Sequence, residues 1–326
     1  MAAHTLESIG RELLSYEELV LAAHVSPDAD AVGSVFGLAA TLASLGKRVS
    51  VYLADPIGES LYPLLPKVPF GSNVPPGPFE ALVVLDTAAM KRVGPEIETL
   101  LSRAQVSFNI DHHVSNPGWA KHNFIDEHAP ATAVLVYEML DLLHIKVLPE
   151  VADLLYAGLL DDTGGFCFSN TNSRGFRCAA ALVDSGARPE VVSNTLYFSQ
   201  PLRLLKLQAA AIDALELMLD GKLSYITLTQ EMLDRCGAQA SDTEGLIDIA
   251  RRVQGTKAAA FQRQLPNGAW KISLRSKGGP LDVNSVASAF GGGGHRAAAG
   301  CTLSGSAEEV KRSIVDAVKR ALSDAA

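Results

Sequence analysis

Four short apolar runs alternate with helical patterns in the first half of the chain, and this alternation restricts the fold more than any other feature. The runs are EELVLAAH, KRVSVYLA, ALVVLD and AQVSFNID, and residues 30–45 between the first two have a helical pattern. Parallel strands need a crossover of roughly a dozen residues or more, usually a helix. We therefore predict an α/β domain with a mainly parallel sheet, flanked by helices, whose strands have carboxyl ends open to a ligand.

The rest of the chain changes character twice. Helical patterns dominate from 130 to 211, and they run through ATAVLVYEMLDLL, PEVADLLYAGLL, SRGFRCAAALVDSG and PLRLLKLQAAAIDALELML. After Gly221 strand patterns return in LSYITLT, TKAAAFQRQL and AWKISLRS, and a hairpin-like turn at 266–268 joins the last two. We predict a first domain over 1–195, a helical linker over 196–218 and a smaller α/β domain over 219–326.

Charge and the N-terminal segment exclude several classes of protein. A formal net charge of −8 argues against the broad basic surface that holds long duplex nucleic acid, whereas small phosphate substrates stay open. The first twenty residues lack a basic region followed by a long apolar stretch, and no segment approaches the roughly 18 apolar residues of a membrane span. We expect a cytoplasmic protein that does not bind membranes.

Candidate metal ligands occur where the predicted strands end. His24, Asp28 and Asp30 lie between the first strand and the helix after it, and an imidazole with two carboxylates can hold Mn²⁺ or Mg²⁺. An equally weighted alternative is that Asp28 and Asp30 cap the helix and that His24 is a buried core histidine. Asp86 ends the run ALVVL and would face the ligand crevice of an open α/β sheet.

Two further motifs extend this pattern. Asp111, His112 and His113 follow the run VSFNI, and successive residues of extended chain point in opposite directions. One histidine can therefore bind metal while the other faces the substrate. Asp161 and Asp162 precede Thr163 and two glycines, and the alternative there is a helix end broken by Gly164.

A glycine-rich segment marks the second domain. The run Gly291–Gly294 is followed by His295 and Arg296, and glycines let a backbone approach an anion closely. From the residues alone a flexible turn after a helix is the favoured interpretation, and the run lacks the Gly-Lys-Ser/Thr end of a P-loop. Arg275 and Arg177 are candidate phosphate contacts, although such arginines are more often solvated.

In this order the motifs resemble those of the DHH phosphoesterase superfamily, and the Gly-Gly-Gly-His segment resembles its associated DHHA1 domain. The resemblance extends from His24 to Gly300 and implies an active site in the cleft between the two domains. It implies two divalent metal ions that share the carboxylate of Asp86, with Mn²⁺ favoured and Mg²⁺ left open. One set of ligands would be His24, Asp28 and Asp86, and the other would be Asp30, Asp86, His112 and Asp162. The role of Asp161 stays open.

The same resemblance implies functional residues and substrates. His113 would contact the phosphate or assist proton transfer, with Asp86 at the catalytic centre. The substrate-binding candidates are Gly292, Gly293, Gly294, His295, Arg296, Arg275 and Arg177. The form of both domains is most similar to bacterial family members that hydrolyse short single-stranded oligoribonucleotides and 3′-phosphoadenosine-5′-phosphate, and it implies a homodimer.

Four other functions are weighed against this one. Cyclic dinucleotide hydrolysis stays open because the bond and the substrate size are similar. Family II inorganic pyrophosphatases share the first motifs but lack this form of second domain, and RecJ-type exonucleases carry further nucleic-acid-binding modules. A nucleotide-binding protein without catalysis would be expected to have replaced some ligands, whereas every metal-matching position here is His or Asp.

Overall fold

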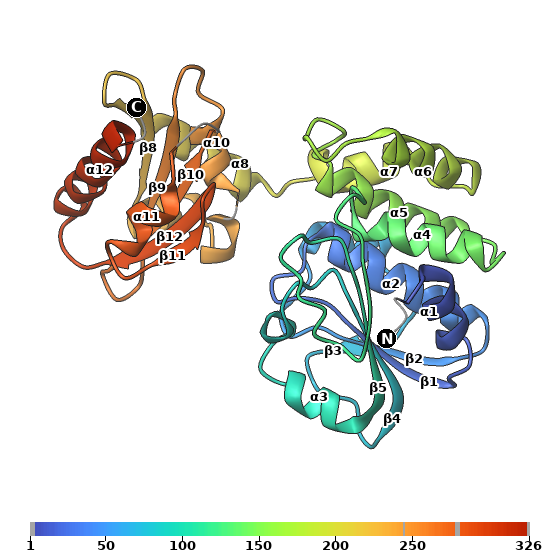
Figure 1. Ribbon diagram of the computed structural model, residues 1–326. Coiled ribbons are helices and arrows are strands. Elements are labelled where there is room, and N and C mark those ends of the chain that lie inside the picture. Colours follow the sequence, from blue (N-terminus) through green and yellow to red (C-terminus); the bar gives the residue numbers. More distant parts are fainter. Residues whose placement is uncertain (1–3, 244, 278–280, 325–326) are drawn as a thin grey trace. The chain divides into compact units, whose positions relative to one another are not determined.

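The computed structural model describes residues 4–243, 245–277 and 281–324. The chain divides into two compact units, Met1–Ser199 and Gln200–Ala326. Each unit contains one six-stranded sheet with helices packed on it (Figure 1). None of the helices in the described part of the chain combines the length and the apolar character needed to cross a membrane.

The sheet of the first unit is parallel throughout, as the alternating pattern predicts. Its strands are β1 (Glu18–Ala22), β2 (Arg48–Tyr52), β3 (Phe70–Gly71), β4 (Phe79–Leu85), β5 (Ala104–Asp111) and β6 (His122–Ile125), in the order β3-β2-β1-β4-β5-β6. All five neighbouring pairs are parallel. Because β1, β4 and β5 are adjacent, the three strand ends that carry the predicted ligands lie at one edge of the sheet.

Helices cover both faces of this sheet. They are α1 (Leu6–Leu13), α2 (Ala29–Ser44), α3 (Ile97–Arg103), α4 (Thr132–Leu142), α5 (Pro149–Asp162), α6 (Ser173–Asp184) and α7 (Pro189–Ser193). Successive side chains of β1 point to opposite faces of the sheet and so contribute to two separate cores. Leu19 and Leu21 pack with residues of α1, α2, α4 and α5. Val20 packs on the other face with Ile97 and Leu100 of α3. Asn172 caps the start of α6, and Gly186, which has a positive φ, follows its end.

Two glycines let α2 and α5 pack very closely. A Cβ at Gly33 would lie 2.3 Å from the carbonyl oxygen of Leu154, and a Cβ at Gly158 would lie 2.7 Å from Oδ1 of Asp30. No side chain fits at either position without a shift of neighbouring atoms. This close approach brings the end of α5, with Asp162, to the start of α2, with Asp30.

The second unit has a mixed sheet in the order β11-β12-β10-β9-β8-β7. Its strands are β7 (Leu215–Met218), β8 (Leu223–Leu228), β9 (Ala258–Gln264), β10 (Trp270–Ser276), β11 (Gly293–His295) and β12 (Ala298–Leu303). Among these described strands only β8 and β9 are parallel, and β9 and β10 form the predicted hairpin. The helices are α8 (Leu202–Asp213), α9 (Gln230–Cys236), α10 (Leu246–Arg251), α11 (Val283–Ser288) and α12 (Ala307–Asp324).

The prediction of one helix over 201–219 is wrong at its C-terminal end. Helix α8 stops at Asp213, and residues Leu215–Met218 form β7, antiparallel to β8. Leu219, Asp220 and Gly221 all have positive φ and turn the chain back. Pairing with β8 satisfies the backbone N–H and C=O groups of this segment. The periodicity of its side chains does not reveal that such a pairing partner is available. Segment 200–218, predicted as a linker, therefore belongs to the second unit, where Leu207 and Ala211 enter its core.

Helices cover the two faces of the second sheet unequally. On one face α11 and α12 pack on residues of β8, β9, β10 and β12. On the other face α8, α9 and α10 enclose a core with β8 and β9, and no residue of β10, β11 or β12 in the described chain belongs to that core. The face formed by these three strands carries the groove described below.

Candidate metal centre and glycine-rich groove

The predicted metal ligands of the first unit converge at the carboxyl edge of the sheet, and we call them the strand-edge cluster. Its members are His24, Asp28, Asp30, Asp86, His112 and Asp162. Nε2 of His24 lies 3.5 Å from Oδ2 of Asp86 and 3.6 Å from Oδ2 of Asp28. Nε2 of His112 lies 3.6 Å from Oδ1 of Asp86 and 3.4 Å from Oδ2 of Asp162. Asp86 thus presents one carboxylate oxygen to each histidine.

Asp86 adopts an uncommon backbone conformation. Its φ is +52°, in the left-handed region that aspartate tolerates better than most residues. Its N–H donates to the carbonyl of Ile110, 3.0 Å away. Strain of this kind persists where the surroundings fix it, and it turns the carboxylate between the two histidines.

Both histidines of the cluster are oriented by backbone carbonyls. Nδ1 of His24 lies 2.8 Å from the carbonyl oxygen of Val25, and Nδ1 of His112 lies 3.1 Å from that of Ala129. A proton on Nδ1 that is donated to a carbonyl leaves Nε2 free to act as a ligand. Arg92 adds a positive charge close by, with Nη2 3.3 Å from Nδ1 of His24.

Asp30 is held by the start of α4. Its side chain accepts hydrogen bonds from the N–H groups of Thr132, at 2.6 Å, and Ala133, at 2.9 Å. The Thr132 hydroxyl donates to Oδ1 of Asp86 at 3.0 Å. Sequence reasoning missed Thr132. The available signal was Ala131, an N-cap residue without a side-chain acceptor, since a buried helix start needs its acceptors from elsewhere.

Asp28 caps α2, as one interpretation of the sequence predicts, and it also faces His24. One oxygen caps α2 by accepting from the N–H of Ala31 at 3.0 Å, while the other faces His24. Asp161 and Asp162 end α5, and Oδ2 of Asp161 accepts from the N–H of Ala29 at 3.2 Å. Asp161 therefore supports the start of α2, while Asp162 faces His112.

The electrostatics of the cluster favour bound cations. Burial and repulsion from Asp86 and Asp162 raise the pKa of Asp30 well above its usual value. Burial raises the pKa of Asp162 to about 6, although the charge of His112 opposes the rise. Burial lowers the pKa of His24, but Asp28 and Asp86 raise it more, to about 10.

The donor atoms also suit metal binding. They form overlapping groups whose ligand atoms lie within 4.8 Å of one another: His24, Asp28 and Asp86; Asp30, His112 and Asp162; and Asp86, His112 and His113. Carboxylate and imidazole groups are donors that divalent metal ions accept, so this set of residues fits bound divalent ions.

His113 has a different setting from its neighbour. Its Nδ1 lies 2.7 Å from Oδ1 of Asp111, which is fully buried, and its own side chain is 44% exposed. Asn116 donates to the other oxygen of Asp111 at 2.6 Å. The hydrogen bond that His113 donates to the carboxylate of Asp111 raises the pKa of His113, although burial opposes this. Asp111, which the sequence analysis names within its motif without assigning it a role, is thus placed to position His113.

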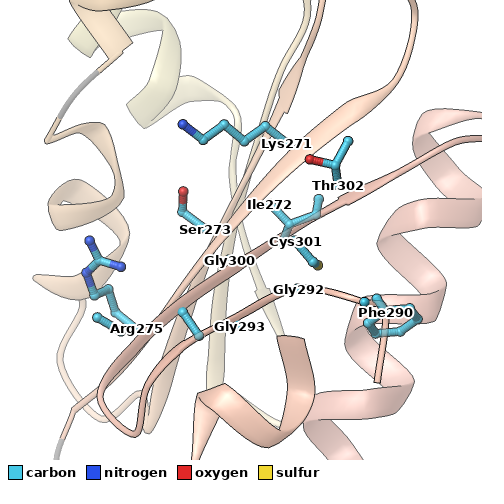
Figure 2. A pocket seen from close by; sticks show the side chains of 13 residues that line it. Lys271, Ile272, Ser273, Arg275, Phe290, Gly292, Gly293, Gly300, Cys301 and Thr302 are labelled. Carbon is cyan, nitrogen blue, oxygen red and sulfur yellow. The ribbon is translucent and has the colours of Figure 1, made fainter. Parts of the chain in front are cut away.

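The glycine-rich segment of the second unit is part turn and part strand: Gly291 lies in a turn after α11, as the sequence interpretation favoured, whereas Gly293 and Gly294 lie in a strand. Gly293–His295 form β11, which pairs with β12. A groove of about 650 Å³ lies along β10, β11 and β12 (Figure 2). Its lining includes the predicted Gly292, Gly293 and Arg275, whereas Gly294, His295 and Arg296 do not line it.

The two arginines of α6 differ from each other. Arg174 pairs with Asp126 at 2.6 Å and with Glu138. Arg177 is exposed, and within the described chain no hydrogen bond or ion pair joins it to the strand-edge cluster.

Comparison with known families accounts for both units. Residues 18–159 match the DHH family, N-terminal domain, and residues 225–324 match the DHHA1 domain. The chain is 33% identical over 313 residues to the bifunctional oligoribonuclease and PAP phosphatase NrnA of Thermus thermophilus, with 94% of this chain and 91% of the relative covered. This chain belongs to the DHH phosphoesterase family. It is therefore a hydrolase that acts on phosphate esters, in a family whose enzymes depend on divalent metal ions.

Other members of the DHH family support the same assignment. The NrnA protein of Bacillus subtilis is 27% identical, and the match covers 90% of this chain and 91% of the relative. The crystal structure of an exopolyphosphatase-related protein from Bacteroides fragilis superposes with a TM-score of 0.89 at 23% identity, covering 97% of this chain and 95% of that one. At that identity the likeness shows a shared fold.

Proposed function

We propose that this DHH phosphoesterase hydrolyses short oligoribonucleotides and 3′-phosphoadenosine-5′-phosphate (PAP), using a water activated by two divalent metal ions. The relatives named NrnA, which match more than nine tenths of their own length, support the substrates. The observation that carries the mechanism is the position of Asp86, whose two oxygens face Nε2 of His24 and Nε2 of His112. A carboxylate placed in this way can serve two ions at once.

The strand-edge cluster would supply the ligands. His24, Asp28 and Asp86 would hold one ion, and Asp30, Asp86, His112 and Asp162 would hold the other. Such ions, when bound, lower the pKa of water and neutralise charge on phosphoryl oxygens. We propose Mn²⁺, because Mg²⁺ prefers oxygen ligands and this set contains two imidazoles.

His113 is the proposed proton donor to the leaving oxygen. Asp111 holds Nδ1 of this histidine, so that its other ring nitrogen, Nε2, can carry a proton to the substrate. Asp111 itself is fixed by Asn116 and by the N–H of His112 at 2.8 Å. This network keeps the ring of His113 in one orientation while its half-exposed side chain stays accessible to substrate.

Hydrolysis of a substrate panel tests the proposal. The panel contains a dinucleotide, PAP, cyclic di-AMP and pyrophosphate, each with Mn²⁺, with Mg²⁺ or with a chelator. We expect cleavage of the dinucleotide and PAP with Mn²⁺, no cleavage with chelator, and loss of cleavage in Asp86→Asn. Asp184→Asn, which changes an exposed aspartate of α6, should keep full activity.

Other results of the panel would redirect the assignment. Preference for cyclic di-AMP would replace the proposed substrates with cyclic dinucleotides. Four intact substrates with metal-loaded protein would contradict the catalytic proposal and favour a binding protein. The homodimer implied by the family resemblance stays a prediction, which light scattering on the purified protein would test.

A further inference from the structure

Side chains of two kinds alternate along β10. Ile272 and Leu274 enter the core under α11 and α12, so Lys271, Ser273 and Arg275 project to the other face (Figure 2). On that face the strand borders the groove of the second unit. The groove therefore has a cation at each end of this row and a hydroxyl between them.

The neighbouring strand β12 contributes small residues to the middle of the groove. In the antiparallel register Thr302 is opposite Lys271, Gly300 is opposite Ser273 and Ala298 is opposite Arg275. Gly293 of β11 is in turn opposite Gly300. The middle of the groove is thus bounded by backbone and a serine hydroxyl, while larger polar groups stand at the Lys271 end.

The fold does not require glycine at every position of this segment. A Cβ at Gly292 would lie 2.2 Å from the carbonyl oxygen of Gly300, and one at Gly294 would lie 2.5 Å from that of Ala298. A Cβ at Gly293 meets no atom closer than 3.9 Å. Packing explains the first two glycines, whereas at Gly293 the missing side chain only leaves the groove open.

The charges along the groove lack protein counterions. Among the described residues that line it, none is Asp or Glu. Within the described chain the ammonium group of Lys271 has no hydrogen bond or ion pair, and the guanidinium of Arg275 donates to the carbonyl of Leu274 at 3.1 Å. Lysine on the opposite side of the sheet behaves differently, since Lys311 pairs with Glu216 at 2.8 Å. In a chain of net charge −8, two cations without carboxylate partners favour an anionic ligand.

The distance between these cations indicates the kind of anion. Lys271 and Arg275 are four residues apart on one strand, which separates their Cα atoms by about 13 Å. Two phosphates on one ribose are closer together than this, and so are neighbouring phosphates of an oligonucleotide, whereas phosphates separated by two nucleotides can reach both ends. Ser273 and Thr302 offer hydroxyl donors along the way.

We propose that Lys271, with Thr302 beside it, is a second phosphate contact that favours short single-stranded oligonucleotides over the 3′,5′-bisphosphate of one nucleoside. The proposal rests on the proposed function, because both substrates must be cleaved for selectivity to be measured. Arg275 would serve either substrate, and Lys271 would bind a phosphate that only a linked nucleotide can supply.

Selectivity between two substrates tests this role. The wild type, Lys271→Ala and Lys271→Arg are compared for kcat/KM on a 5′-phosphorylated trinucleotide, which carries three phosphates, and on PAP, both with Mn²⁺. We expect Lys271→Ala to lower the trinucleotide-to-PAP ratio about tenfold, the size of one charged hydrogen bond. The dependence of the trinucleotide KM on salt, as a log–log slope, should weaken by about 0.7, the value for one single-strand phosphate contact. Lys271→Arg should restore most of the trinucleotide-to-PAP ratio and most of the salt dependence.

Controls separate the possible failures. Lys319→Ala, which changes an exposed lysine of α12, should leave the ratio unchanged. Gly293→Val should keep the melting temperature but weaken trinucleotide binding, because its side chain narrows the groove. An unchanged ratio in Lys271→Ala, with active wild type, overturns the role of Lys271 alone. A wild type that cleaves neither substrate overturns the proposed function as well.

Discussion

The hydroxyl of Thr132 donates a 3.0 Å hydrogen bond to the carboxylate of Asp86. The backbone N–H of the same residue donates to Asp30 at 2.6 Å. One buried residue at the start of α4 therefore positions two members of the strand-edge cluster that come from different elements of the fold. Partners of this kind orient metal ligands and affect metal affinity although they do not touch the ion.

Removal of this hydroxyl should weaken metal binding. Thr132→Val keeps the shape and the backbone hydrogen bond to Asp30, but Asp86 loses a donor. We expect the affinity for Mn²⁺, measured by isothermal titration calorimetry, to fall about tenfold or more. Thr132→Ser keeps a hydroxyl and should recover most of the affinity. Equal affinities in Thr132→Val and wild type would show that Asp86 needs no such support.

Adjacent histidines should have separable effects. His112→Asn removes a proposed ligand, so we expect Mn²⁺ affinity to fall on the order of a hundredfold. His113→Asn should retain Mn²⁺ affinity within about twofold but lower kcat roughly a hundredfold or more, as loss of a proton donor does. Calorimetry and steady-state kinetics on both variants distinguish the two roles. Loss of metal binding in His113→Asn would instead make His113 a ligand.

Close packing of α2 and α5 should make Gly33 intolerant of any side chain. A Cβ there meets the backbone oxygen of Leu154, which cannot rotate away, so Gly33→Ala should lower the free energy of unfolding by about 1–3 kcal/mol. Gly58 has φ −54°, and a Cβ at this position would meet no atom within 4 Å, so Gly58→Ala should be neutral or slightly stabilising. Urea denaturation measures both, and equal losses would contradict the packing argument.

The ion pair of Arg174 should stabilise the first unit only above acidic pH. Burial raises the pKa of Asp126, but Arg174 and the N–H of His128 lower it more. A carboxyl group whose pKa is lower in the folded than in the unfolded protein stabilises the fold at pH values above its unfolded-state pKa of about 4. This stabilisation is lost as the pH falls through the folded-state pKa. Arg174→Met should therefore cost about 1–2 kcal/mol at pH 7 and less below about pH 4.

The neighbouring Arg177 provides the control for this measurement. It is exposed, so Arg177→Met should change the free energy of unfolding by less than about 0.5 kcal/mol at either pH. Urea denaturation at pH 7, 5 and 3.5 compares the two variants with the wild type. A loss in Arg174→Met that is the same at every pH would assign its effect to packing rather than to charge.

Local patterns in the chain were enough to predict the first sheet and the chemistry of its edge. Strand periodicity predicts β1, β2, β4 and β5, because burial on both sides of a sheet leaves a direct trace in the order of side chains. Helix ends were equally local, as Asn172 shows by capping its own helix. Residue types at three strand ends were enough to predict that imidazoles and carboxylates meet, since parallel strands end at one edge.

The features that local patterns did not predict depend on contacts between distant segments. Such contacts exist only in the folded chain. Segment 215–218 has a helical pattern, yet it is a strand because β8 offers it a pairing edge. Thr132 and Asp111 carry no local signature of their roles, since their partners belong to other elements or depend on how a loop folds. Gly293 differs from its neighbours only in what surrounds it. Local preference fixes an element, but only packing fixes which atoms come within hydrogen-bonding distance.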